Sequence, residues 1–163
     1  MDPRQRDIAP LLDFIGLRSL IINVPCNIQL TSPMIYKMLT AWPYLHCLVL
    51  APSRSLSHPP SIDHTHVLEL MQKLPNLREL GIRFNASGVA GQERIAGSPS
   101  KLRILRVGRS PICSSGVITL LRSNFPHLEV LDITCEVGAN DGTMFRKRWE
   151  AALEGWKLAR RSS

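Results

Sequence analysis

One short pattern, Leu-x-x-Leu-x-aliphatic, returns five times along this chain of 163 residues. Its first leucines stand at positions 17, 45, 77, 102 and 128, so successive copies lie 28, 32, 25 and 26 residues apart. The copies are Leu17/Leu20/Ile22, Leu45/Leu48/Leu50, Leu77/Leu80/Ile82, Leu102/Leu105/Val107 and Leu128/Leu131/Ile133. A strand signal at this period is typical of a stacked repeat, in which each unit buries its apolar edge only against its neighbours. The pattern therefore predicts an extended binding surface rather than an enclosed catalytic pocket.

Three segments between the leucine motifs have helical patterns. Segment 33–39 follows two good N-cap residues and begins with proline, and segment 61–74 repeats its apolar residues at the spacing of one helix face. A third helix begins at Ser114 or Ser115. It turns four apolar residues inward: Val117, Leu120, Leu121 and Phe125. The stretch after Gly88 is short and rich in glycine, so we expect a turn or a 3₁₀ piece there.

A proline follows each predicted helix, just before the next leucine motif. The phrases are Trp42-Pro43-Tyr44-Leu45, Leu74-Pro75-Asn76-Leu77 and Phe125-Pro126-His127-Leu128, with Ser98-Pro99-Ser100-Lys101-Leu102 one residue longer. A proline ring forbids continuation of a helix and favours extended backbone before it. The predicted unit is therefore helix, proline turn, short strand and loop.

These segments resemble leucine-rich repeats, and in particular the repeat region of fungal F-box/leucine-rich-repeat proteins, where sequences such as that of residues 125–133 are common. The likeness covers roughly residues 17–160. It implies an α/β fold, a right-handed leucine-rich-repeat solenoid of about five repeats with a parallel concave sheet and helices on the convex side. It also implies a protein–protein interaction module like the substrate-recognition region of F-box ubiquitin-ligase subunits.

The chain departs from that family in two ways. The asparagine or cysteine expected at the ninth position of each repeat occurs only as Asn85, and the other units have Pro25, Ser53, Ser110 and Glu136. Only sixteen residues precede the first motif, so no F-box is visible. The sequence therefore does not support binding to a ligase adaptor through any of its residues.

We expect a single domain over residues 1–163, with an N-terminal cap or remnant at 1–16, repeats at 17–140 and a C-terminal capping helix at 141–163. The capping helix has a clean apolar stripe: Phe145, Trp149, Ala152, Leu153 and Trp156. At the other end, five apolar residues are expected to cover the first strand incompletely: Ile8, Leu11, Leu12, Phe14 and Ile15.

Strand side chains alternate between two faces, so the third, fifth and seventh positions of each unit are expected on the open concave face. The partner-binding residues predicted from these positions are Ile21, Cys47, Val49, Glu79, Arg83, Ile104, Arg106, Val130 and Asp132. They form an apolar patch beside Arg83 and Arg106. The alternative is that its valines and isoleucines reflect only strand propensity.

The second positions form a basic column of Arg18, His46, Arg78 and Arg103, followed by Glu129. Like charges on adjacent strands repel, because the strands lie about 4.8 Å apart. We expect Glu79 and Glu129 to relieve this repulsion locally, unless an acidic partner does so or the arginines are simply solvated.

The sequence predicts no catalytic residue, no cofactor and no metal site. The one metal-like cluster has the wrong spacing, because side chains two residues apart on a helix point to different sides; its members are His58, Asp63, His64 and His66. The glycines match no phosphate-binding loop, and the start of a nucleophile elbow at 108–110 fails because Ile112 replaces its second glycine.

The net charge of +7 falls almost entirely in the second half, since residues 1–75 carry +1 and residues 76–163 carry +6. A basic half favours an acidic partner or simply keeps a domain soluble. We expect an unknown protein partner. A membrane is not expected, because no apolar run approaches the ~18 residues that a membrane span requires. Nucleic acid is not expected either, because the basic C-terminal end lacks interleaved aromatics. No secretory signal or Cys-x-x-Cys pair is present, which indicates an intracellular protein, cytoplasmic or nuclear. Two alternatives remain open: nucleic-acid binding through the basic C-terminal half, and a small α/β nucleotide-binding or enzymatic domain.

Overall fold

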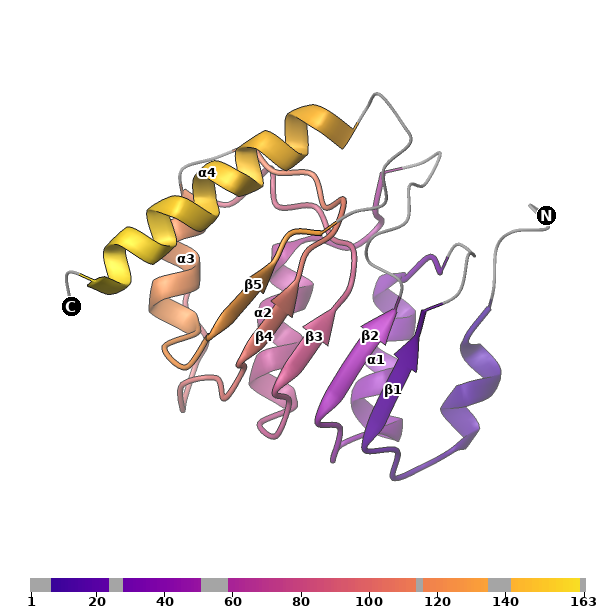
Figure 1. Cartoon of the computed structure of the whole chain (residues 1–163). Coiled ribbons are helices and arrows are strands. Elements are labelled where there is room, and N and C mark those ends of the chain that lie inside the picture. The colour runs from indigo at the N-terminus through magenta and orange to yellow at the C-terminus, as the bar shows by residue number, and fades with distance from the viewer. Residues whose placement is uncertain (1–6, 24–27, 51–58, 114–115, 135–141, 162–163) are drawn as a thin grey trace.

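The computed structural model describes residues 7–23, 28–50, 59–113, 116–134 and 142–161. Strands and helices alternate along most of the chain (Figure 1). In order, the elements are the 3₁₀ helix η1 (Ala9–Asp13), β1 (Ser19–Ile22), α1 (Ser32–Ala41), β2 (Cys47–Leu50), α2 (His64–Lys73), β3 (Glu79–Gly81), β4 (Ile104–Arg106), α3 (Gly116–Asn124), β5 (Val130–Asp132) and α4 (Gly142–Arg161). Each leucine motif contributes one strand, and the predicted α/β class is confirmed.

The five strands form one open parallel sheet in the order β1-β2-β3-β4-β5. The middle leucine of each motif pairs in register with the middle leucine of the next: Leu20, Leu48, Leu80, Leu105 and Leu131. These leucines point away from the open face, and the last four of them are almost completely buried. The prediction that each strand pairs with its neighbour in the sequence is confirmed.

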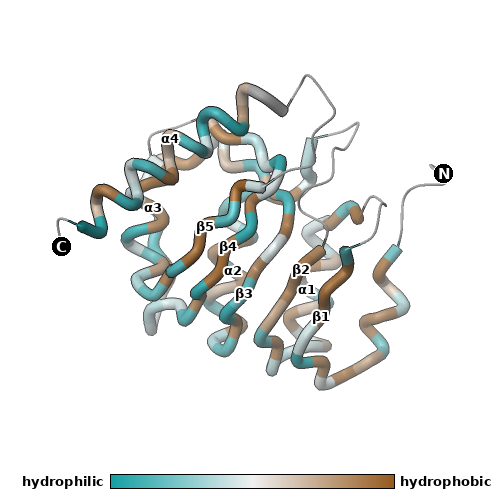
Figure 2. The backbone as a smooth tube through the Cα atoms, in the orientation of Figure 1, coloured by the Kyte–Doolittle hydropathy of each residue, from teal (hydrophilic) through white to brown (hydrophobic). Residues whose placement is uncertain are grey.

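In Figure 1, α1 and α2 lie behind the sheet and α3 lies to the left of β5, so the front face of the sheet carries none of these three helices. Figure 2 shows that β1 and β2 are mainly hydrophobic, whereas hydrophilic residues interrupt β3, β4 and β5. The core lies between the sheet and the helices, where Ile35, Met38 and Leu70 are fully buried. The motif leucines and the apolar helix stripes therefore cover each other, as the repeat pattern predicts.

Each of these three helices ends just before its proline. In the first case, the backbone N–H of Trp42 donates to Met38 O at 2.9 Å, and the chain then turns so that Leu45 N–H donates to Trp42 O at 3.1 Å. The same turn follows α2, from Leu77 N to Leu74 O at 3.0 Å, and α3, from Leu128 N to Phe125 O at 3.1 Å. The predicted proline turn is confirmed as one recurring structure.

The start of α2 differs from the expected segment 61–74. The helix begins at His64 because Asp63 is its N-cap, with Asp63 Oδ1 accepting the N–H groups of Thr65 at 3.0 Å and His66 at 3.4 Å. An aspartate in this position satisfies helix donors that have no partner within the helix. Asp63 therefore ends the preceding loop and caps the helix. The predicted starting residues of α3, Ser114 and Ser115, lie outside the described residues.

No helix interrupts the segment 82–103, all of which is described. Short bridges attach it instead, from Asn85 to Asp63 and from Ala86 to Ile112. This agrees with the turn expected after Gly88.

The two ends of the sheet are covered differently. Beyond β5, α4 packs against α3 and buries Trp149, Ala152 and Trp156, with Phe145 and Leu153 partly buried beside them, so the predicted apolar stripe is confirmed. Beyond β1, Ile8 is buried and Leu11 and Leu12 are half-buried. Phe14 and Ile15 are 64% and 84% exposed, which corrects their predicted part in covering the first strand. A bilayer-crossing helix is absent from the described part of the chain.

Candidate interaction surface

The open face of the sheet brings the predicted third- and fifth-position residues together in two rows. One row runs Cys47, Glu79, Ile104, Val130 from β2 to β5, and the other runs Ile21, Val49, Gly81, Arg106, Asp132 from β1 to β5. Alternation along each strand places both rows opposite the buried leucines. Eight of the nine predicted partner-binding residues thus share this face, and the ninth, Arg83, lies beyond the end of β3.

Arg106 stands at the centre of the polar half of this face. Its Nη2 lies 2.7 Å from Glu79 Oε1, its Nε donates to the same oxygen at 2.8 Å, and its Nη1 donates to Asp132 Oδ2 at 2.6 Å. The second oxygen of Asp132 accepts the backbone N–H of Thr134 at 2.9 Å and its hydroxyl at 2.6 Å. Arg106, on the middle strand β4, therefore links Glu79 on β3 to Asp132 on β5, and each of the two carboxylates forms an ion pair with it. We call Glu79, Arg106 and Asp132 the charged clamp.

Gly81 makes room for this clamp. A Cβ added at Gly81 would lie 3.3 Å from Arg106 Cδ and 3.0 Å from Val49 Cγ1. Arg106 is in register with Gly81, and its side chain reaches Glu79, two residues earlier on the same neighbouring strand. The missing side chain thus lets the guanidinium lie back toward β3.

The clamp fixes the protonation of its own members. The hydrogen bond to Glu79 raises the pKa of Arg106, burial opposes it, and Asp132 adds to the rise. Burial works to raise the pKa of Asp132, but hydrogen bonds from Thr134 and Arg106 outweigh it and hold that pKa below its ordinary value. In the neighbouring row, burial and the charge of Glu79 raise the pKa of the Cys47 thiol. Asp132 is therefore a poor general base and Cys47 a poor nucleophile at neutral pH.

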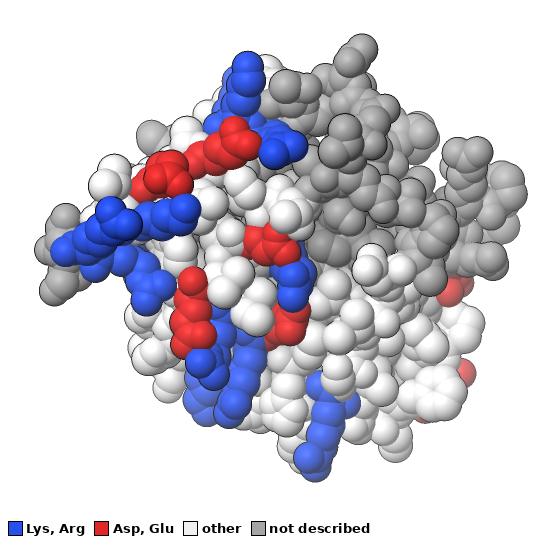
Figure 3. Space-filling model, viewed as in Figure 1, with Lys and Arg blue, Asp and Glu red and all other residues white. Residues whose placement is uncertain are grey.

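A hollow of about 310 Å³ opens on this face, lined by Ile21, Asn23, Val49, Glu79, Arg106, Asp132 and Thr134. Its two sides differ in chemistry. Figure 3, which views the same face, shows charged side chains gathered over the β3–β5 side and mostly uncharged ones over β1 and β2. Ile21 is 61% exposed on the apolar side, and Val130 is 46% exposed at the far edge of the other row.

Arg83 does not share the hollow with Arg106. Its Nε donates to Arg109 O at 3.3 Å, and burial, with a contribution from the charge of Arg109, lowers its pKa. The predicted pair of arginines beside an apolar patch is therefore corrected to one arginine, Arg106, already neutralised by two carboxylates.

Glu79 also corrects the expected relief of the basic second-position column. Because adjacent residues on a strand point to opposite faces, Glu79 is directed to Arg106 and away from Arg78. Glu129 does as expected and pairs with Arg103 at 2.7 Å. Asn23 and Thr134 also line the hollow, although the set of partner-binding residues predicted from the sequence omits them. Their seventh positions in the repeat could have identified them. The space that Gly81 leaves for Arg106 was not predicted from the sequence.

The histidine cluster divides between two sets of partners. Nε2 of His66 lies 2.7 Å from Ser32 Oγ and its Nδ1 lies 2.8 Å from Asp63 Oδ1. His64 is buried, with its Nε2 3.4 Å from Glu93 Oε1. No group of three or more potential metal ligands occurs among the described residues, and His58 lies outside them. Two of the ninth-position residues, Asn85 and Ser110, are described. They join neighbouring loops: Asn85 O accepts His64 N–H at 3.1 Å, and Ser110 Oγ accepts Phe84 N–H at 3.1 Å.

Comparisons of the chain with protein-family models, with curated proteins and with solved structures found no match.

Proposed function

We propose that this chain is a protein–protein interaction module that binds its partner on the open face of the sheet, in a right-handed leucine-rich-repeat solenoid. The strand order supports the solenoid, because each strand pairs with its sequence neighbour and none of α1, α2 and α3 lies on the open face. Its role resembles that of the substrate-recognition region of F-box ubiquitin-ligase subunits. We place the protein inside the cell, where its thiols stay reduced.

The observation that carries the proposal is the exposure of Ile21 beside a rigid charged centre. Ile21 is 61% exposed next to Val49 on a strand face, while the clamp holds Arg106 with three contacts shorter than 3 Å. A partner that covers Ile21 gains apolar burial, and the clamp loses little conformational freedom because its side chains are already fixed. We expect the partner to insert an apolar side chain over Ile21 and to place polar groups on the clamp.

The same geometry favours this function over a nucleotide-binding or enzymatic domain. Doubly wound sheets bind their ligands where the strand order reverses, and the order here does not reverse. On the open face, the carboxylates of Glu79 and Asp132 both form ion pairs with Arg106, which makes them poorly suited to act as proton donors or acceptors. Nucleic-acid binding is the second candidate, favoured only by the excess of positive charge after residue 75.

Affinity capture from a cell lysate with three tagged proteins tests the proposal. The variant Ile21→Glu places a charge on the apolar half of the face, and the control Tyr36→Glu makes a similar change at a residue on α1 that is 54% exposed. Both variants are first checked for parental circular dichroism and melting temperature. We expect partners held by the parent and by Tyr36→Glu to be lost from Ile21→Glu. Equal capture by all three proteins, or nucleic acid as the only captured species, contradicts the proposal.

A further inference from the structure

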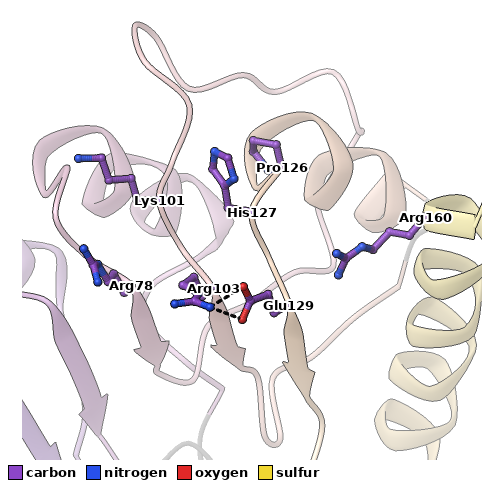
Figure 4. A pocket seen from close by; sticks show the side chains of 7 residues that line it. All are labelled: Arg78, Lys101, Arg103, Pro126, His127, Glu129 and Arg160. Atoms are coloured by element: carbon purple, nitrogen blue, oxygen red, sulfur yellow. Dashed lines mark hydrogen bonds and ion pairs between the residues drawn. The ribbon is translucent and has the colours of Figure 1, made fainter. Parts of the chain in front are cut away.

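A second hollow, of about 500 Å³, lies away from the clamp, at the end of the sheet where the strands begin (Figure 4). We call it the basic groove, and six of its lining residues matter here: Arg78, Lys101, Arg103, His127, Glu129 and Arg160. Four are lysines or arginines and one is a carboxylate. The groove is therefore strongly positive.

The repeat itself sets the spacing of these charges. Arg78, Arg103 and Glu129 are the second-position residues of three successive units, and backbone bonds hold them side by side, from Arg103 N to Arg78 O at 2.8 Å and from Glu129 N to Arg103 O at 2.8 Å. Lys101 and His127 each stand two residues before a member of this row. Three neighbouring repeats thus present polar side chains at one edge.

Arg160 enters from a different element. It extends from α4 toward Glu129 in Figure 4, and its Nη1 donates to Leu128 O at 2.7 Å. Its guanidinium also lies over the Trp156 ring, 5.1 Å from the centroid. Because Trp156 is buried, these contacts fix the position of Arg160 at the wall of the groove.

The carboxylate of the groove neutralises only one of the four cations. Both oxygens of Glu129 accept from Arg103 Nη2, at 2.7 and 2.9 Å, and Oε1 also accepts from its Nε at 2.9 Å. Among the described residues, neither Arg78 nor Lys101 has an ion-pair partner. The bidentate pair also shows that a carboxylate fits this row of strands, since Glu129 meets Arg103 as an anionic ligand would.

We propose that the basic groove binds an anionic peptide segment, through carboxylate or phosphate oxygens that reach Arg78, Lys101 and Arg160. The cations come from three separate segments, so an extended chain with several anionic side chains suits them better than a single small anion. Among the residues that the structure describes, the lining contains no Phe, Tyr or Trp on which bases could stack, which favours a peptide over single-stranded nucleic acid. This site is independent of the open face and of the function proposed for it.

Fluorescence anisotropy at low and physiological salt tests the site with four labelled probes: a Glu-rich peptide, the same peptide with one phosphoserine, its Gln-substituted counterpart and a single-stranded DNA of equal charge. We expect the two anionic peptides to bind the parent and the Gln peptide not to bind. Tighter binding of the phosphoserine peptide assigns the site to phosphate, and equal binding assigns it to carboxylate; both results support the proposal.

Matched variants locate the binding. Lys101→Glu removes a groove cation, and Lys37→Glu makes the same change of net charge on the exposed side of α1. Glu129→Gln removes the internal carboxylate and releases Arg103. We expect affinity for the anionic peptides to fall roughly three- to tenfold in Lys101→Glu, to stay within twofold in Lys37→Glu, and to rise in Glu129→Gln. All three residues are exposed, so circular dichroism should show parental folding.

Three outcomes overturn the proposal. One is no binding of either anionic peptide at low salt. Another is an equal loss of affinity in Lys101→Glu and Lys37→Glu, which would mean attraction to net charge alone. The third is tighter binding of DNA than of both peptides, lost in Lys101→Glu, which reassigns the groove to nucleic acid.

Discussion

Asn124 at the end of α3 accepts a hydrogen bond from the backbone N–H of Ile95, with 2.7 Å between Oδ1 and N, across 29 residues of sequence. Its Nδ2 donates to Glu93 O and Leu120 O, both at 2.9 Å. One buried amide thereby anchors the segment between β3 and β4 that has no helix to hold it.

Replacing Asn124 with Ala should be costly, because it leaves two partly buried backbone groups of the anchored segment without partners. We expect a loss of roughly 2–3 kcal/mol in the free energy of unfolding, measured by urea denaturation. Ser123→Ala, one residue earlier at an exposed position, serves as the control and should change stability by less than about 0.5 kcal/mol. Equal midpoints for the two variants would mean that Asn124 anchors nothing.

Gly116 marks a close approach of backbones that tolerates no side chain. A Cβ there would meet Val89 O at 2.7 Å and the carbonyl carbon of Ala90 at 2.8 Å, whereas at Gly155 it would meet only the end of the Ile118 side chain. We therefore expect Gly116→Ala to lower the thermal midpoint by more than Gly155→Ala, with a cost of about 1–3 kcal/mol against a smaller one. Differential scanning calorimetry of the two variants decides the order, and a reversed order refutes the packing.

The cap at Asp63 predicts a pH-dependent part of stability. Burial works to raise the pKa of Asp63, but the hydrogen bonds of Thr65 and His66 outweigh it and lower the pKa from 3.8 to about 2. Because the folded value lies below the ordinary one, the unfolded chain takes up the proton first. The stabilisation is thus complete above about pH 4 and declines as the pH falls toward 2.

We expect Asp63→Ala to cost about 1 kcal/mol at pH 7, as for other N-cap replacements, and less near pH 2. Asp63→Asn keeps a neutral cap, so its stability should follow pH less steeply than that of the parent. Urea midpoints at a series of pH values provide the measurement. A constant difference between parent and Asp63→Ala across this range would argue against an ionised cap.

The charged clamp predicts a titration change that can be measured directly. Removing the guanidinium with Arg106→Met should raise the pKa of Asp132 toward its ordinary value, but only in part, because the bonds from Thr134 remain. Thr134→Val, which removes the hydroxyl donor, should also raise it. The carboxyl carbon of Asp132 followed by NMR during acid titration reports both shifts. An unmoved pKa in Arg106→Met would show that the ion pair is absent in solution.

The recurring leucines predicted the order of strands and their partners because every unit has one way to bury the same edge. The pairing of Leu48 with Leu80 follows from motif spacing alone, and the end of α1 at Ala41, shortly before Pro43, follows from the chemistry of proline. Signals of this kind are repeated several times, so each copy supports the others.

Features that occur once were harder to predict. The charged clamp depends on the side chain of Arg106, which passes over Gly81 to reach Glu79 on the same neighbouring strand. The sequence pattern of one strand does not specify which residue of another strand its side chains will contact. Successive side chains on a strand point to opposite faces, so Glu79 could have been predicted to point away from Arg78. The expectation that Glu79 would relieve the repulsion within the basic column neglected this alternation. Asn124 gave no local signal, because its partners lie in a distant loop.

The sequential strand order also decides how the molecule comes apart. Each strand touches only its nearest neighbours, so stability is shared locally and one terminal unit can detach while the rest stays folded. Two buried tryptophans of α4 stabilise the end of the sheet at β5. At the β1 end, the described residues that cover the sheet are Ile8, which is buried, and two half-buried leucines. Fraying under denaturant should therefore start at β1, and its amides should exchange hydrogen before those of β4.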